Sequence, residues 1–178
     1  MNEDNPLKIS SEWVQKLLTV PEFEKQDFKR AGSVKSDLKT ACVMANGDGG
    51  LIIFGVDDPK KGISEDRLQG IEERPEALGE VKRGFYDEIE PSLEAPETEP
   101  PQFIEVKVEK TSGDVVTVVL IVINKSNTVH SYNNATYVRS GSQSRQINAQ
   151  QIHKLCLRRG VDYVNGGDYS PAPASAHD

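Results

Sequence analysis

The chain has 178 residues, of which 36% are hydrophobic and 28% are charged, and its net charge is −7; these values are typical of one globular domain with a polar surface. No apolar run approaches the roughly 20 residues that span a bilayer, and the first residues, MNEDNPLK, lack the basic and then apolar order of a signal peptide. This composition excludes a membrane-spanning protein, and we expect a cytoplasmic one.

A short helix is expected first in the chain. Ser10 or Ser11 can cap a segment in which Trp13 and Leu17 follow a helical spacing, and Pro21 ends it. The next segment, EFEKQDFKR, alternates enough to predict a strand.

A second helix is expected over residues 34–45, where apolar residues recur on one face. Asn46 and Gly47 tolerate the left-handed backbone that ends many helices. The glycine-rich turn NGDGG has two interpretations, a helix stop before a tight strand entry or a place where a ligand approaches the backbone. It lacks the GxxxxGK[ST] and GxGxxG spacings of the common nucleotide folds.

The apolar run LIIFGV, residues 51–56, predicts a strand that is covered on both faces. Asp57 and Asp58 follow it directly, at the position where open α/β sheets place ligands. Adjacent strand residues point to opposite faces, so one of the two would face a given site. The alternative interpretation is a solvated turn, Asp-Asp-Pro-Lys-Lys.

The second half of the chain predicts one more helix and a long hairpin. Residues 75–89 repeat apolar positions at helical spacing and carry acids on the other face, and a proline-rich connection follows at 94–101. Residues 104–109 alternate as a half-exposed strand, and the turn TSGD joins them to the apolar strand 115–123.

A second hairpin is expected around Asn133 and Asn134, and Asn148 with Gln151 can cap a last helix. These elements predict the α/β (α+β) class, with a mixed sheet that contains antiparallel hairpins and is flanked by helices. We divide the chain into an N-terminal helix (1–20), a main domain (21–164) and a flexible tail (165–178).

The charges are unevenly distributed along the chain. Residues 65–109 hold fourteen acids and five bases, whereas residues 110–164 hold seven bases and two acids. An acidic total therefore does not exclude a basic face, because phosphate contacts depend on local Lys and Arg. Cys42 and Cys156 lie in helix-like apolar patterns and are expected as reduced core thiols.

Acidic residues also gather in EFEKQDFKR. If this segment is extended, Glu22 and Glu24 share one face while Asp27 and Lys29 share the other. Neighbouring carboxylates repel one another unless a cation relieves the repulsion. Mg²⁺ or Mn²⁺ does so and can activate water for attack on phosphorus, while the lysine could contact the phosphate.

The segment YVRSGSQSR, residues 137–145, combines two arginines with three serines around a glycine. Arginine binds phosphate through two parallel hydrogen bonds, and serine hydroxyls add further ones. The alternative is a surface turn with ordinary charges.

Three stretches in this order, FEKQDFKR, LKTACVMANGDGGLIIFGVDD and YVRSGSQSRQINAQQI, resemble the Schlafen family's AlbA-type domain over about residues 22–157. The resemblance implies a mixed α/β module that binds nucleic acid. In some Schlafen members it also implies a metal-dependent endoribonuclease that acts on structured RNA.

Matched residue by residue, the resemblance implies that Glu22, Asp27 and Asp57 are the catalytic and metal-binding carboxylates, with Mg or Mn as the cofactor. From the chemistry of their side chains we expect Lys29, Arg139, Ser140, Ser142 and Arg145 to be the nucleic-acid-binding residues. Asp27 replaces the usual glutamate and is one methylene shorter, which either shifts the ion or signals lost catalysis. The sequence does not decide between Glu22 and Glu24, or between Asp57 and Asp58.

Two hypotheses lead. The first is a nucleic-acid-binding domain with a divalent-metal-dependent nuclease site, with RNA favoured over DNA as the partner. The second is a non-catalytic binding or regulatory module on the same fold, which Asp27 favours. A protein-interaction domain that uses the acidic helix at 75–90 is a third hypothesis, and nucleotide binding at the glycine-rich turn is a fourth. A homodimer would lengthen the basic surface.

Overall fold

The computed structural model describes residues 11–19, 25–58, 65–94, 98–141, 143–163 and 169–171, with only the backbone of 161–163 and of 169–171. The helices of this part are α1 (Ser11–Leu17), α2 (Val34–Asn46), α3 (Glu76–Asp87) and α4 (Ala149–Arg159), with short 3-10 turns η2 (Glu65–Arg67) and η3 (Ile71–Glu73). The strands are β1 (Gln26–Lys29), β2 (Gly50–Phe54), β3 (Ile89–Glu90), β4 (Gln102–Glu109), β5 (Val115–Ile123), β6 (Ser131–Tyr132), β7 (Tyr137–Ser140), β8 (Gln143–Gln146), β9 (Val161–Tyr163) and β10 (Tyr169–Pro171).

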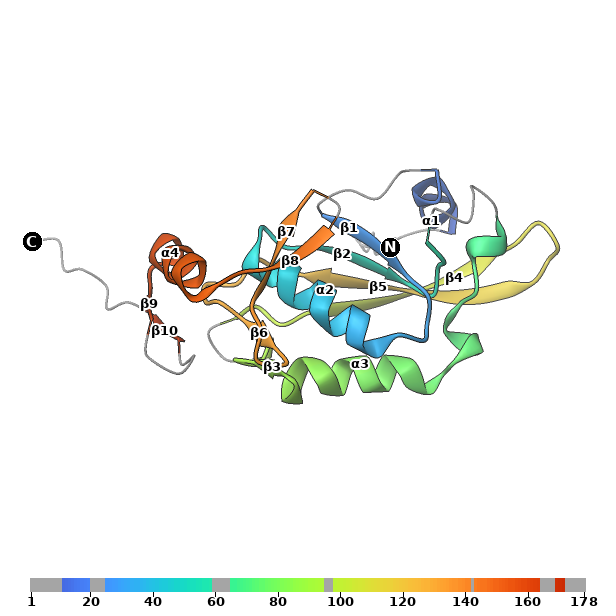
Figure 1. Ribbon diagram of the computed structural model, residues 1–178. Coiled ribbons are helices and arrows are strands. Elements are labelled where there is room, and N and C mark those ends of the chain that lie inside the picture. Colours follow the sequence, from blue (N-terminus) through green and yellow to red (C-terminus); the bar gives the residue numbers. More distant parts are fainter. Residues whose placement is uncertain are drawn as a thin grey trace, which may run out of the picture.

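A four-stranded mixed sheet in the order β1-β2-β5-β4 forms the centre of the fold (Figure 1). The neighbours β1 and β2 run parallel and are joined through α2, and β5 runs antiparallel to both β2 and β4. Three two-stranded ladders, β3-β6, β7-β8 and β9-β10, complete the described strands. The structure is an α+β fold with antiparallel hairpins, as the sequence predicts.

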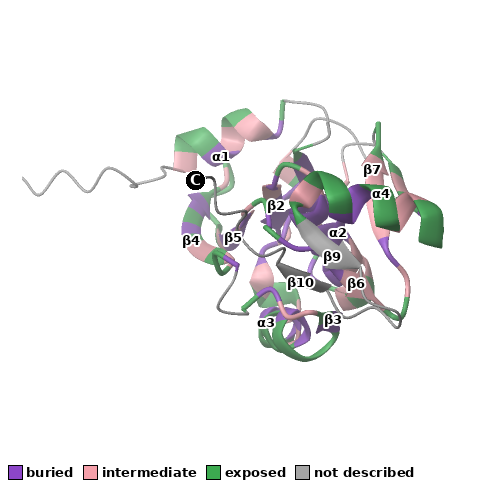
Figure 2. Ribbon diagram, turned by 90° about the vertical axis from the view of Figure 1, so that its left-hand side faces the viewer, coloured by how far each residue is buried: buried purple, intermediate pink, exposed green. Residues whose placement is uncertain are grey.

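Both faces of the sheet are covered, which explains the continuous apolar run of β2. Ile52 and Phe54 pack in one core with α2 and α3, whereas Ile53 packs in a second core with Val14 of α1. Figure 2 shows α2 largely buried, and green exposed surface on the outer sides of α1 and α3. None of the helices in the described ranges is both long and apolar enough to cross a bilayer.

Most of the local predictions are confirmed. The expected helices at 34–45 and 75–89 are α2 and α3, and the long hairpin is β4-β5. Asn148 and Gln151 form the expected capping box of α4, and both cysteines are buried and free.

The region around Asn133 and Asn134 is more complex than one hairpin. Both residues have positive φ, 52° and 58°, in a tight turn bridged by Tyr132 and Ala135, so the turn itself is confirmed. The segments on either side pair elsewhere: β6 pairs with β3, and β7 pairs with β8. In the expected tail, β10 pairs with β9, while 164–168 and 172–178 lie outside the described residues.

Candidate nucleic-acid interface

The glycine-rich turn after α2 is tightly packed by the chain itself. Gly49 has a positive φ of 82°, and a Cβ there would lie 2.6 Å from the Ile123 carbonyl oxygen. A Cβ on Gly50 would lie 2.7 Å from Met44 Sδ. These contacts support the structural interpretation of the turn. The short connection between α2 and β2 packs against neighbouring atoms that a side chain at either glycine would approach too closely.

Asn46, the last residue of α2, fastens β7 to this turn. Its amide nitrogen donates to the carbonyl oxygens of His130 (2.9 Å) and Tyr137 (3.1 Å), and its amide oxygen accepts from His130 N (2.7 Å). The residue is buried, so these bonds satisfy its polar atoms. Asn46 thereby determines where the β7-β8 hairpin lies against α2.

Arg159, at the end of α4, binds the same turn from the other side. Its guanidinium donates to the carbonyl oxygens of Ser126 (2.6 Å), Asn46 and Gly47. A cation is favourable here because the C-terminus of α2 carries partial negative charge. Burial lowers the pKa of Arg159, the nearby Asp48 raises it and Arg158 lowers it.

These elements surround a hollow of about 510 Å³, which we call the basic pocket. Among the described residues that line it, one is acidic, Asp48, and the cationic ones are Lys25, Lys125, Arg139, Arg145, Arg158 and Arg159. Asp48 Oδ1 lies 3.8 Å from Lys125 Nζ. Like charges gathered at this density repel one another, and an anion in the pocket would relieve the repulsion.

The predicted phosphate-binding residues differ in their surroundings. Arg145 is exposed and lines the basic pocket. Arg139 also lines it, but its side chain is only 10% exposed and its Nη1 lies 3.7 Å from Asp27 Oδ2. Ser140 is exposed at the end of β7, and Ser142 lies outside the described residues.

Lys29 lies next to the predicted catalytic Asp27 and is not among the described residues that line the basic pocket. The two residues share one face of β1, and Lys29 Nζ is 3.2 Å from Asp27 Oδ2. Thr40 Oγ1 of α2 donates to the same carboxylate at 3.2 Å. The Asp27 side chain is 9% exposed, so water solvates its carboxylate only slightly. Lys29, Arg139 and Thr40 stabilise its negative charge instead.

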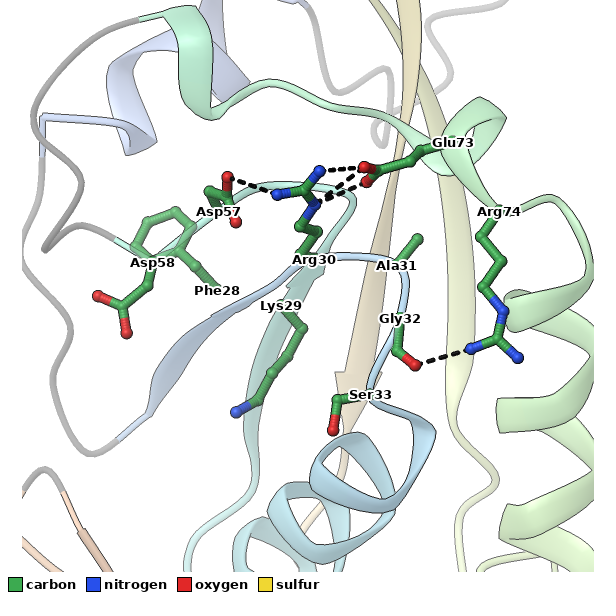
Figure 3. Close-up of a pocket in the computed structure, with 10 residues that line it drawn as sticks. All are labelled: Phe28, Lys29, Arg30, Ala31, Gly32, Ser33, Asp57, Asp58, Glu73 and Arg74. Carbon is green, nitrogen blue, oxygen red and sulfur yellow. Dashed lines mark hydrogen bonds and ion pairs between the residues drawn. The ribbon is translucent and has the colours of Figure 1, made fainter.

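Asp57 lies at the carboxyl end of β2, in a second hollow of about 500 Å³ that also has Asp58 in its wall. Its carboxylate lies 3.5 Å from Arg30 Nη1, and Arg30 also binds Glu73 (Figure 3). We call this hollow the strand-end pocket; Lys29, Ala31, Gly32 and Ser33 also line it. Asp27 is not among its lining residues.

The carboxylates that the structure describes do not fit a shared metal ion. Asp27 and Asp57 each lie against a cation of the chain, Lys29 and Arg30 respectively. Within the described ranges, no group of three His, Cys, Asp or Glu side chains is placed to hold a metal. Glu22 and its alternative Glu24 lie outside the described residues, so the three-carboxylate site stays a prediction.

Sequence reasoning missed several residues of these sites. Asp37, an acid in the first turn of α2, resembles an ordinary helix-start residue, yet it is fully buried, and this burial raises its pKa to about 7. Arg158 and Arg159 carried a signal, two adjacent bases in the last turn of a helix, but nothing in the sequence placed that helix next to β7. Lys25 and Lys125 are far apart in sequence and meet only through the fold.

Comparison with solved structures shows the fold. The crystal structure of the DIP2311 protein from Corynebacterium diphtheriae matches with a TM-score of 0.51 and 17% sequence identity, over 74% of this chain and 26% of that protein. The chain thus spans about a quarter of the length of that relative. Comparison with curated proteins gives no match.

The family is shown by the sequence itself. The description of the matching family is Schlafen, AlbA_2, and the match covers residues 22–148, which include β1, the glycine-rich turn, Asp57 and the β7-β8 hairpin. This family is associated with nucleic acids. The chain belongs to the Schlafen AlbA_2 family.

Proposed function

We propose that this protein binds the phosphate backbone of nucleic acid in the basic pocket. The observation that supports it is the charge of the pocket: six cationic side chains surround one hollow and a single acid among the described lining residues opposes them. Phosphate binding depends on such a local cluster, so the net charge of −7 for the whole chain does not oppose it.

Some cations of the basic pocket are bound by groups of the chain itself, and others are exposed and can contact phosphate. Arg159 is held by backbone carbonyls and Arg139 lies against Asp27, so these two shape the pocket. Arg145 and Arg158 are exposed and form no ion pair with any described residue. We therefore assign the main phosphate contacts to Arg145 and Arg158, with Lys25 at the rim.

The lining of the basic pocket favours backbone recognition over base recognition. No aromatic ring belongs to its described lining, whereas proteins that hold single strands stack bases on such rings. Binding should then be tolerant of sequence and sensitive to salt. Structured RNA, favoured over DNA by the family resemblance, is the nucleic acid that we propose.

Titration of labelled tRNA and of single-stranded DNA at several salt concentrations tests the proposal. We expect tRNA to bind more tightly, with an affinity that falls as salt rises. An affinity independent of salt, or no binding of either nucleic acid at low salt, would contradict it.

A metal-dependent endoribonuclease is the second candidate. Asp57 and Asp58 line a pocket at the carboxyl end of β2, where sheets commonly place ligands, and Glu22, Asp27 and Asp57 would hold the Mg or Mn ion. Lys29 beside Asp27 favours binding without turnover instead.

Incubation of tRNA with the protein in Mn²⁺ or in EDTA separates the two candidates. Intact tRNA under both conditions is expected for a binding module. Cleavage that needs Mn²⁺ and disappears in Asp57→Ala would establish the endoribonuclease.

A further inference from the structure

The strand β4 lies at one edge of the central sheet. It is the last strand in the order β1-β2-β5-β4, and all of its eight residues pair with β5. No other described strand pairs with it, and on its outer side Gln15 Nε2 donates to the Glu109 carbonyl oxygen at 2.9 Å. An edge of this length is a template on which a strand of another chain can pair.

Every second residue of β4 directs its backbone polar groups to this outer side. Thr117 of β5 lies opposite Lys107, but its N–H donates to the Glu72 carboxylate at 2.8 Å. Antiparallel strands alternate between residue pairs that bond each other and pairs that point away from each other. Lys107 therefore points its N–H and its carbonyl oxygen outward. Glu105 and Glu109 do the same, which agrees with the side-chain bond that Glu109 accepts.

The outward-pointing residues also alternate in charge. Glu105, Lys107 and Glu109 are exposed, and they share one face of the strand because residues two apart do so. A second β4 that runs antiparallel about a two-fold axis at Val106 places Glu105 of each copy opposite Lys107 of the other. Both residues of such a pair point their backbone groups outward, so they can exchange both hydrogen bonds. Opposite charges directly across a ladder stabilise it.

Other alignments of two β4 strands are less favourable. An axis at Lys107 sets this lysine opposite itself and Glu105 opposite Glu109, and like charges in this position destabilise a sheet. An axis at Val108 pairs Lys107 with Glu109, but it leaves the first half of the strand without a partner. The charges of β4 thus oppose unselective pairing at the edge and match a second copy in one alignment that covers most of the strand.

We infer that β4 is the interface through which two copies of this chain form a dimer, with one continuous sheet across both. Glu105 and Lys107 form two symmetric charge pairs in this dimer, and Val106 lies on its two-fold axis. No residue of β4 belongs to the described lining of the basic pocket. The inference therefore does not rest on nucleic-acid binding.

Charge reversal at these two positions tests the inference. The mass of the purified full chain is measured by sedimentation equilibrium over a range of protein concentrations, in the absence of nucleic acid. The variants are Lys107→Glu, Glu105→Lys and the double variant Glu105→Lys/Lys107→Glu. Lys35→Glu is the matched control, because Lys35 is an exposed lysine of α2.

We expect a dimer of the wild-type chain and a dissociation constant at least about tenfold higher for each single variant, because the two-fold symmetry turns each substitution into two like-charge pairs. The double variant exchanges the two charges and should restore the wild-type constant. An equimolar mixture of the two single variants should dimerise more tightly than either variant alone. Lys35→Glu should behave as wild type.

A wild-type chain that stays monomeric would overturn the inference and leave the edge to a strand of another protein. Equal dissociation constants of wild type and both single variants would also overturn it, because the dimer would then use another surface. A double variant that dimerises no better than the single variants would contradict the alignment at Val106 and with it the inference.

Thermal melting follows the folding of each variant. Lys107 Nζ contacts Thr117 Oγ1 at 2.5 Å, so Lys107→Glu removes a contact inside the chain as well. If Lys107→Glu has no melting transition, the comparison of Glu105→Lys with wild type decides the test. A raised dissociation constant of Glu105→Lys then supports the inference, and an unchanged one overturns it.

Discussion

At the scale of single residues, Asp27 connects the predicted carboxylate site with the predicted phosphate-binding site. Its carboxylate lies between Lys29 and Arg139, 3.2 and 3.7 Å away, so one acid restrains two cations that the sequence assigns to phosphate binding. The alternation of residues along β1 predicts that Asp27 and Lys29 share a face. It does not predict Arg139, which reaches Asp27 only because Asn46 holds β7 against α2.

Removal of the Asp27 charge should strengthen anion binding. In Asp27→Asn the amide can keep a contact with Thr40 but no longer neutralises Arg139, so we expect tRNA affinity at low salt to rise about two- to tenfold. Fluorescence anisotropy measures the affinity. Asp114→Asn, which removes an equal charge in the exposed β4-β5 turn, should change it much less.

Weaker binding of tRNA by Asp27→Asn, in a protein that melts as wild type does, would contradict this prediction. It would mean that Asp27 orients Arg139 for phosphate instead of competing with phosphate for it.

His130 gives a prediction for acid stability. It is fully buried, with Nδ1 2.6 Å from the Pro91 carbonyl oxygen and Nε2 2.6 Å from Ser126 Oγ. Burial lowers its pKa, the Pro91 carbonyl raises it and Arg159 lowers it, so the net pKa lies below 6.5. The unfolded chain thus takes up a proton first as the pH falls, and the folded state loses stability below about pH 6.5.

The His130→Gln variant should isolate this contribution. Gln cannot be protonated. The free energy of unfolding of the wild-type protein should therefore fall relative to that of His130→Gln as the pH falls from 6.5, by at most about 1.4 kcal/mol per pH unit. Urea unfolding of both proteins between pH 7.5 and 5 measures it. A difference that stays constant over this range would show that His130 is protonated in the folded state as easily as in the unfolded one.

At the scale of elements, local patterns predict the helices and the long hairpin because their signals are local. The apolar spacing of α2 and α3, the alternation of β4 and the Asn148–Gln151 capping box are all contained in short windows of sequence. Local patterns do not predict the pairings of β6 with β3 and of β7 with β8, because strands of two or four residues carry little periodicity.

The turn between α2 and β2 offers a matched pair of glycine substitutions. Gly49→Ala would force a side chain onto a residue with a φ of 82° and to within 2.6 Å of a backbone oxygen, so we expect a loss of about 2–4 kcal/mol of unfolding free energy. Gly79→Ala lies inside α3 with no atom within 4 Å of the new Cβ and should stabilise the protein by up to about 1 kcal/mol.

Chemical denaturation of both variants gives these free energies. Equal stability of Gly49→Ala and wild type would show that the turn can relax, and that the close entry into β2 is not what positions the wall of the basic pocket.

At the scale of the whole molecule, the uneven charge of the sequence becomes a basic pocket within an acidic protein. Five of its six described cations come from residues 110–164, the stretch that composition marks as basic, and Lys25 joins them through the fold. The composition of residues 110–164 therefore predicts that a positively charged face exists. The placement of α4 beside β7 shows which cations form it. The homodimer that would lengthen this surface stays a prediction.

The salt dependence of tRNA binding by Arg145→Ala/Arg158→Ala tests the central claim most directly. For each phosphate contact that is lost, the slope of log affinity against log salt should become shallower by about 0.7 to 0.9, so the double variant should lose about 1.4 to 1.8 of the wild-type slope if each arginine binds one phosphate. Arg83→Ala, an exposed arginine of α3 outside the basic pocket, should keep the wild-type slope. An unchanged slope in the double variant would place the phosphates elsewhere and contradict the account.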